Sequence, residues 1–155
     1  MKKIIIIALM LIVSSQTYAW SLPDVFNKFG KTDECQGKSD KNLNICSLLK
    51  EAATKMQKNL PLVISANVSM IKMYSIGNTL VSEVEFGIDS KSLAERLIKA
   101  GISDSQYKES LVKLMKSSAC QDESSVYLIK NGGIFNTVYK FNDDTVYYTF
   151  DISNC

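Results

Sequence analysis

Apolar residues are arranged along this 155-residue chain in three patterns, each typical of a different kind of segment. Near the N-terminus they form one continuous run, residues 4–13, behind Lys2 and Lys3. Further on they recur every three or four residues, which is typical of an amphipathic helix, or alternate with polar residues, which is typical of a strand. The patterns divide the chain into a leader and a folded domain.

The start of the chain has the layout of a cleavable signal peptide over residues 1–19. Thr17-Tyr18-Ala19 places small residues three before and one before a cut that leaves Trp20 as the new N-terminus. A membrane anchor is the alternative, but a spanning helix needs about 20 apolar residues, more than this run supplies. We therefore expect an exported, soluble protein, in the periplasm or released from the cell, with no stable membrane insertion.

A helical period opens the domain that follows the leader. Residues 20–39 are a polar lead-in, and residues 40–155 are predicted to form a single domain. From Asp40, apolar residues recur at threes and fours, and the helix should end before Pro61, because the residue preceding proline is disfavoured in helical geometry. Capping and stop signals predict three later helices: from Asp89 or Ser90 to Ala100, from Ser103 or Asp104 to Cys120, and from Asp122 to Lys130.

Alternating residues predict two β-hairpins. The first has arms over residues 63–74 and 79–88, and the second has arms over residues 134–141 and 145–152. In the last arm the residues expected to share one face are Val146, Tyr148, Phe150 and Ile152. The order of helix, hairpin, helices and hairpin predicts an α+β fold: a four-stranded antiparallel sheet with helices packed on one face.

The charge balance changes once the leader is removed. The whole chain has 18 basic and 16 acidic residues, and loss of Lys2 and Lys3 leaves 16 of each. No basic patch remains, so the usual electrostatic signature of nucleic-acid binding is missing. We expect a protein partner and no nucleic acid.

All four cysteines, Cys35, Cys46, Cys120 and Cys155, follow the leader, and two disulfides are expected in an oxidising compartment. Three pairings are possible, and the sequence does not choose among them. We favour Cys35 with Cys46, which would fasten the lead-in to a helix, and Cys120 with Cys155, which would hold the chain end. A four-thiolate zinc site is the alternative, but the chain has no CxxC pair and is predicted to be exported.

Several catalytic arrangements are excluded by composition. The chain has no histidine, which removes the commonest general base and most imidazole metal sites. No glycine-rich phosphate-binding motif is present. We therefore predict no catalytic residue, no cofactor and no metal. The remaining enzyme hypothesis uses carboxylates alone, from the residues Glu83, Glu85, Asp143 and Asp144.

The last hairpin is rich in aromatic residues, which either belong to the core or form a partner-binding surface. The candidate contact residues are Tyr139, Phe141, Tyr147 and Tyr148. On the second interpretation they line a groove that receives a helix or strand of another protein.

The layout of residues 60–155 resembles that of the disulfide-bearing α/β type II secretion pilotins. The shared features are Leu60-Pro61, two strands around Gly77-Asn78, helices reaching Cys120, a stop at Gly132-Gly133, a tyrosine-containing hairpin and a terminal Cys155. The resemblance implies a Cys120–Cys155 disulfide and a non-catalytic protein that binds a secretin. This chain differs in lacking an acylated cysteine and in carrying a helix with Cys46 before the shared region.

The favoured functional hypothesis is therefore a periplasmic accessory protein of a secretion or pilus assembly system, which binds an envelope protein such as a secretin or pilus subunit. The alternative is a periplasmic inhibitor or immunity protein that blocks a toxin or hydrolase. Its only candidate inserting loop is the turn Asn142-Asp143-Asp144.

Overall fold

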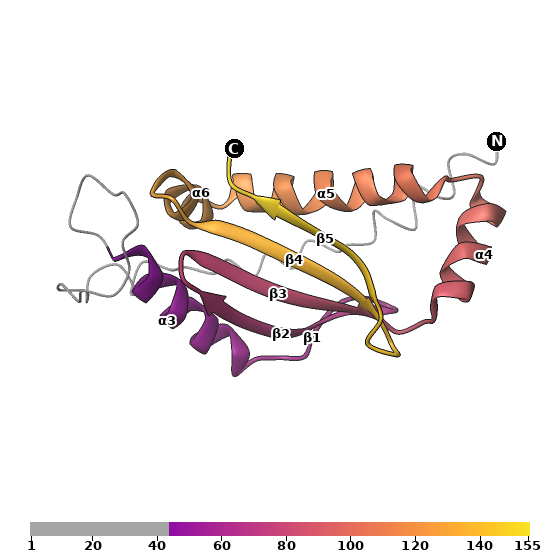
Figure 1. The fold of residues 1–155 in the computed structure, drawn as a ribbon, viewed down its shortest axis with the longest axis horizontal. Coiled ribbons are helices and arrows are strands. Elements are labelled where there is room, and N and C mark those ends of the chain that lie inside the picture. The colour runs from indigo at the N-terminus through magenta and orange to yellow at the C-terminus, as the bar shows by residue number, and fades with distance from the viewer. Residues whose placement is uncertain (1–43) are drawn as a thin grey trace.

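A five-stranded sheet forms the centre of the computed structural model, which describes residues 44–155 (Figure 1). The predicted leader, the lead-in and Cys35 lie outside the described residues. The strands, in both chain and spatial order, are β1 (Leu62–Ser65), β2 (Val68–Ile76), β3 (Thr79–Phe86), β4 (Ile134–Phe141) and β5 (Val146–Ile152). Neighbouring strands are antiparallel, except that β3 and β4 are parallel. The predicted α+β class is confirmed, but the prediction of a four-stranded antiparallel sheet is wrong, because the sheet has five strands and one parallel pair.

Two features of the chain explain this difference. A two-residue turn at Ala66 and Asn67 divides the predicted first arm into β1 and β2, which pair with each other. The helices between β3 and β4 form a crossover connection, which returns the chain to the end of the sheet where β3 began. A strand entering from that end is parallel to β3.

The four described helices are α3 (Ile45–Gln57), α4 (Ser90–Ala100), α5 (Asp104–Gln121) and α6 (Glu123–Lys130). Each begins after an N-cap side chain that accepts a backbone N–H: Asn44, Asp89, Ser103 and Asp122. Such caps satisfy an N–H group that has no partner within the helix. Gly101, with φ of 68°, ends α4 in the left-handed conformation that glycine adopts without a steric cost. The predicted helix boundaries are correct within a few residues, although the first helix begins at Ile45 and not at Asp40.

The core lies on one face of the sheet, where all four helices pack. One cluster joins Leu49 of α3 and Leu128 of α6 to Leu80 of β3. The other joins helices α4 and α5 to Phe86 and its aromatic neighbours on β4. The sheet residues of both clusters share one face through the strand register: Met73, Leu80, Val84, Phe86, Tyr139 and Phe141. Figure 1 shows α3 along the β2 edge of the sheet, α5 along the β5 edge and α4 at one end.

A β-bulge changes the predicted alternation of β5. Tyr139 pairs with Tyr148, but the next residue, Lys140, pairs with Val146, so Tyr147 is an extra residue. Val146 is therefore shifted off the face of Tyr148 and is 54% exposed, contrary to the predicted alternation. The same bulge turns Tyr147 toward the aromatic core, with its ring centroid 5.7 Å from that of Phe86.

A disulfide joins Cys120, in the last turn of α5, to Cys155, with Cα atoms 5.6 Å apart. It is the pairing predicted above, and it leaves no thiolate at these two positions for zinc. Cys46 is also disulfide-bonded, and its predicted partner Cys35 lies outside the described residues. Within residues 44–155, none of the helices has the length and apolar character to span a bilayer.

Candidate functional site

An open groove of about 900 Å³ lies between α3 and the outer edge of β2. Helix α3 contributes most of its polar wall, and the last residues of β2 form the other wall. The lining residues include Ser47, Lys50, Ala53, Thr54, Gln57, Lys58, Met73, Tyr74, Ser75 and Gly77. The groove has an apolar base and a polar rim, a composition typical of binding sites.

The edge of β2 that faces this groove has no strand beside it among the described residues. β1 pairs with β2 only up to Met70, so the outer edge from Lys72 to Ile76 is left without a neighbouring strand. The N–H of Met73 points outward and donates to Oε1 of Gln57 at 2.9 Å. A strand that pairs on one side directs every second residue to the other, so the N–H and C=O of Ser75 also face outward. The groove thus contains peptide groups that can form strand hydrogen bonds.

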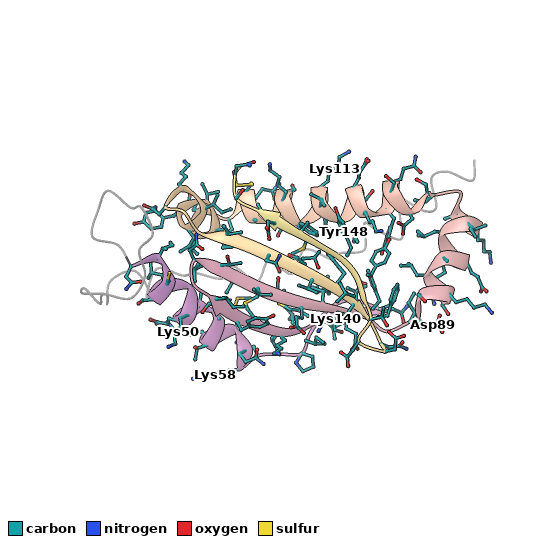
Figure 2. All side chains as sticks on the ribbon, viewed as in Figure 1. Lys50, Lys58, Asp89, Lys113, Lys140 and Tyr148 are labelled. Carbon is teal, nitrogen blue, oxygen red and sulfur yellow. A yellow bond between two sulfur atoms is a disulfide. The ribbon has the colours of Figure 1, made fainter. Side chains whose placement is uncertain are left out.

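The charge of the groove is positive. Among residues 44–155, its charged lining residues are Lys50 and Lys58, and no aspartate or glutamate lines it. Neither lysine forms an ion pair with a carboxylate in the described part of the chain, whereas Lys55 on the same helix is paired with Glu51 at 2.9 Å. Both lysines lie along α3 at the lower left of Figure 2. The groove therefore favours a ligand with negative charge.

The predicted aromatic residues occupy two different environments. Tyr139 and Phe141 are 3% and 4% exposed, and both belong to the core around Phe86. Burial raises the pKa of Tyr139 to about 12, with a smaller contribution from Tyr107. Their burial favours the core interpretation for these two residues. Tyr147 and Tyr148 are half-buried on β5, so only these two can contribute to a surface.

Tyr147 and its neighbours fasten α5 to the sheet. Its hydroxyl donates to Oδ1 of Asp104 at 2.6 Å, and Asp104 also pairs with Lys108 at 2.7 Å. The Lys108 ammonium lies 4.9 Å from the Tyr147 ring centroid and 5.5 Å from that of Tyr148. Burial and the Asp104 carboxylate raise the pKa of Tyr147, while hydrogen bonds from Lys108 and Tyr147 lower the pKa of Asp104. These contacts give both tyrosines a structural role, and their predicted role in binding a partner stays a prediction.

Glu83 is the most strongly buried of the candidate carboxylates. It lies on the sheet face opposite the core, paired with Lys140 at 2.7 Å and with Lys72 at 3.9 Å. Burial acts to raise its pKa, but the hydrogen bond and charge of Lys140, with help from Lys72 and Tyr74, lower the pKa overall. Glu83 is thereby held as a carboxylate, whereas a general acid needs a raised pKa.

The candidate aspartates do not join Glu83. Asp143 and Asp144 are exposed in the β4–β5 turn, and Asp143 accepts the N–H of Thr145 at 2.9 Å. Asp144 has a positive φ of 65°, which is a turn conformation. Glu85 lies two residues from Glu83 on the same face of β3. Among residues 44–155 no group of three metal-binding side chains comes together.

The sequence alone does not indicate the groove. Ala53 and Met73 stand out only as apolar residues, and Lys50 and Lys58 only as part of a polar helix face. The contact between Gln57 and Met73 spans 16 residues and depends on how α3 lies along β2. The only local signal is that the polar face of this helix is basic, since Glu51 is its single acidic residue.

Comparison with known proteins gives likenesses of fold. No protein-family model matches the chain, and no curated protein matches it. A candidate secreted protein from Pseudomonas aeruginosa is 18% identical, with a TM-score of 0.58, covering 75% of this chain and 95% of its own. The pilotin EpsS of the Vibrio vulnificus type 2 secretion system is 11% identical, with a TM-score of 0.55, covering 70% and 87%. The pilotin AspS from Vibrio cholerae is 12% identical, with a TM-score of 0.49, covering 71% and 89%. The resemblance to pilotins is thus confirmed for the fold.

Proposed function

We propose that this protein is a non-catalytic accessory protein of the cell envelope, which binds a protein partner in the groove between α3 and β2. The observation that carries the proposal is the groove itself, where a basic helix faces a strand edge that has no neighbouring strand among the described residues. A pilotin from a type 2 secretion system has the same fold, which supports a role in a secretion or pilus assembly system.

The chemistry of the described residues supports binding over catalysis. The most buried candidate carboxylate, Glu83, is held ionised between two lysines, and the aspartates of the β4–β5 turn shape that turn. An enzyme built on carboxylates needs two that face one substrate across a cleft. The groove instead offers a helix wall, an apolar base and backbone donors and acceptors, which are the parts of a peptide-binding site.

The proposal includes export by the predicted signal peptide of residues 1–19 and residence in the periplasm. Fractionation of cells that produce the tagged chain should place it in the periplasmic fraction. N-terminal sequencing of that material should begin at Trp20. Recovery of the uncleaved chain with the inner membrane would contradict this part of the proposal.

Photo-crosslinking in living cells tests the partner and its position together. A photoreactive amino acid is placed at Thr54 or Lys58 in the groove, at Tyr148 on β5, and at Lys113 on α5 as a matched exposed control (Figure 2). We expect Thr54 and Lys58 to give one crosslinked envelope protein, a secretin or pilus subunit, identified by mass spectrometry. Crosslinks at Tyr148 alone would move the site to the β5 surface. Capture of one toxin or hydrolase, without an assembly subunit, would overturn the accessory role.

A further inference from the structure

We propose that the groove binds an extended, acidic segment of the partner, which adds to the outer edge of β2 as a further strand of the sheet. The inference rests on the proposed function and specifies the conformation and the charge of what the groove holds. Three features of the described residues support it: the free strand edge, the side chain that covers part of it, and the spacing of two lysines.

The backbone of β2 supplies the hydrogen bonds for an added strand. The outward N–H and C=O of Ser75 and the outward C=O of Met73 have no strand partner within residues 44–155. The pairing of Lys72–Ile76 with β3 is regular, because the irregularity in this ladder lies between Met70 and Lys72. A straight edge of this kind accepts a peptide through main-chain hydrogen bonds, while the side chains of alternate residues give specificity.

Gln57 stands where the first hydrogen bond of an added strand would form. Its side-chain Oε1 accepts from the N–H of Met73 at 2.9 Å, as the carbonyl oxygen of a neighbouring strand would. Gln57 is exposed at the C-terminal end of α3, so an incoming peptide carbonyl can replace its amide. A side chain that covers a strand edge in this way protects the edge while no partner is bound.

The two lysines match the repeat of an extended chain. Lys50 and Lys58 are eight residues apart on α3, which is about 12 Å along a helix. Residues four apart in a strand are separated by about 13 Å and lie on the same face. Helix α3 packs along β2, as both line the groove and Gln57 accepts the N–H of Met73. The geometry therefore favours a segment with acidic residues at positions i and i+4.

The same charges argue against a second copy of this chain as the occupant. In a symmetric dimer that pairs two β2 edges, the Lys50 and Lys58 side chains of both copies would face one another across the new junction. In the part of the chain that the structure describes, no carboxylate lines the groove to balance them. Like charges directly opposite each other destabilise strand pairing. An acidic segment of a different protein avoids this repulsion.

Nuclear magnetic resonance titration of the mature chain with a synthetic peptide tests the inference before the natural partner is identified. The probe is the peptide Thr-Glu-Val-Thr-Val-Glu-Thr, whose glutamates are four residues apart, and the control peptide has lysine in place of both glutamates. We expect the acidic peptide to bind at least about tenfold more tightly than the control. Each of its glutamates forms an exposed ion pair with one lysine of the groove, and the two modest contributions add. Hydrogen exchange at the Ser75 amide should slow about tenfold as that N–H gains an acceptor. Equal binding of both peptides, binding of neither, or changes confined to α5 would overturn it.

Variants separate strand addition from other modes of binding. The double variant Lys50→Glu with Lys58→Glu should bind the acidic peptide about tenfold more weakly. The matched exposed double variant Lys99→Glu with Lys113→Glu should bind it with unchanged affinity. Ser75→Pro removes the outward donor and should abolish binding, whereas Ser75→Thr should retain it.

Gln57→Ala provides the sharpest test, because it removes the side chain that competes with the peptide. Strand addition predicts binding about two- to tenfold tighter, the range of one exposed hydrogen bond. Weaker binding would mean that Gln57 contacts the ligand directly, which contradicts the proposal. If in-cell crosslinks at Thr54 capture an envelope protein while the peptide fails, the strand mode is wrong and the proposed function stands. If both fail, the groove is not the binding site.

Discussion

Removal of the Cys120–Cys155 disulfide should destabilise the domain by an amount that the loop length sets. The bond joins residues separated by 35 positions. In the unfolded chain it therefore closes a loop made of the segment that forms α6, β4 and β5 in the folded domain. In the chain-entropy model a loop of this length contributes about 3.8 kcal/mol near room temperature. Domains of ordinary stability unfold with about 5–15 kcal/mol, so Cys120→Ala with Cys155→Ala should remove a large part of the total.

Urea unfolding followed by far-ultraviolet circular dichroism, in buffer without reductant, measures this loss. With an m-value of about 1.5 kcal/mol/M, the unfolding midpoint should fall by about 2.5 M. The control is Lys116→Ala, which removes the 2.7 Å hydrogen bond from Lys116 to Asn154 at the same end of the chain and keeps the disulfide. This exposed contact should contribute less than about 1 kcal/mol. A loss below about 1 kcal/mol in the double variant would refute the loop-closure reasoning.

Three further predictions concern single side chains. Because the pKa of Glu83 is lowered, its ion pairs stabilise the fold above about pH 4.3, where an unfolded glutamate ionises, and this stabilisation disappears as the pH falls through the folded pKa. Glu83→Gln should thus lower the free energy of unfolding by about 1–3 kcal/mol near neutral pH and by little in strong acid. Urea unfolding at the two pH values measures this difference. An equal loss at the two pH values would contradict a stabilising role for the ionised carboxylate. Tyr147→Phe should lower the free energy of unfolding by about 1 kcal/mol. In an ultraviolet titration the variant should lack one tyrosine that ionises at a higher pH than usual, because the pKa of Tyr147 is raised. An unchanged titration would be evidence against the Asp104 hydrogen bond. Gly133→Ala places a Cβ 2.9 Å from the Leu128 carbonyl oxygen, so thermal unfolding should show a loss of about 1–3 kcal/mol, and no loss would mean that the α6–β4 junction adjusts freely.

Features determined by neighbouring residues could be predicted from the sequence. Asp89 and Ser103 cap helices because their side chains reach N–H groups three residues away, and Gly101 ends α4 through its own φ. The β4–β5 turn likewise depends on the run Asn142-Asp143-Asp144. Each of these signals lies within four residues of its effect, so it acts whatever the tertiary fold around it.

Features that depend on distant residues could not be predicted in this way. The parallel pairing of β3 with β4 brings Ser82 within hydrogen-bond distance of Asn136, 54 positions away, where its hydroxyl donates to the carbonyl oxygen. Alternation alone describes which residues share a face, but it does not identify the neighbouring strand. The bulge at Tyr147 arises because that side chain packs in the aromatic core, and it reverses the face expected for Val146. The groove has the same origin, since it forms where α3 lies beside an edge of β2 that no strand of residues 44–155 covers.

The parallel junction between β3 and β4 also sets an order for folding. β1, β2 and β3 follow one another closely and can pair as soon as residues 62–86 are available. β3 then keeps an unpaired edge until three helices and β4 have followed, which delays the central hydrogen bonds of the sheet. Pairing of strands so far apart in sequence is slow, and an exposed central edge can pair with other chains meanwhile. A chain shortened before Ile134 should therefore aggregate, because β3, the strand with the most buried residues, would keep that edge permanently unpaired.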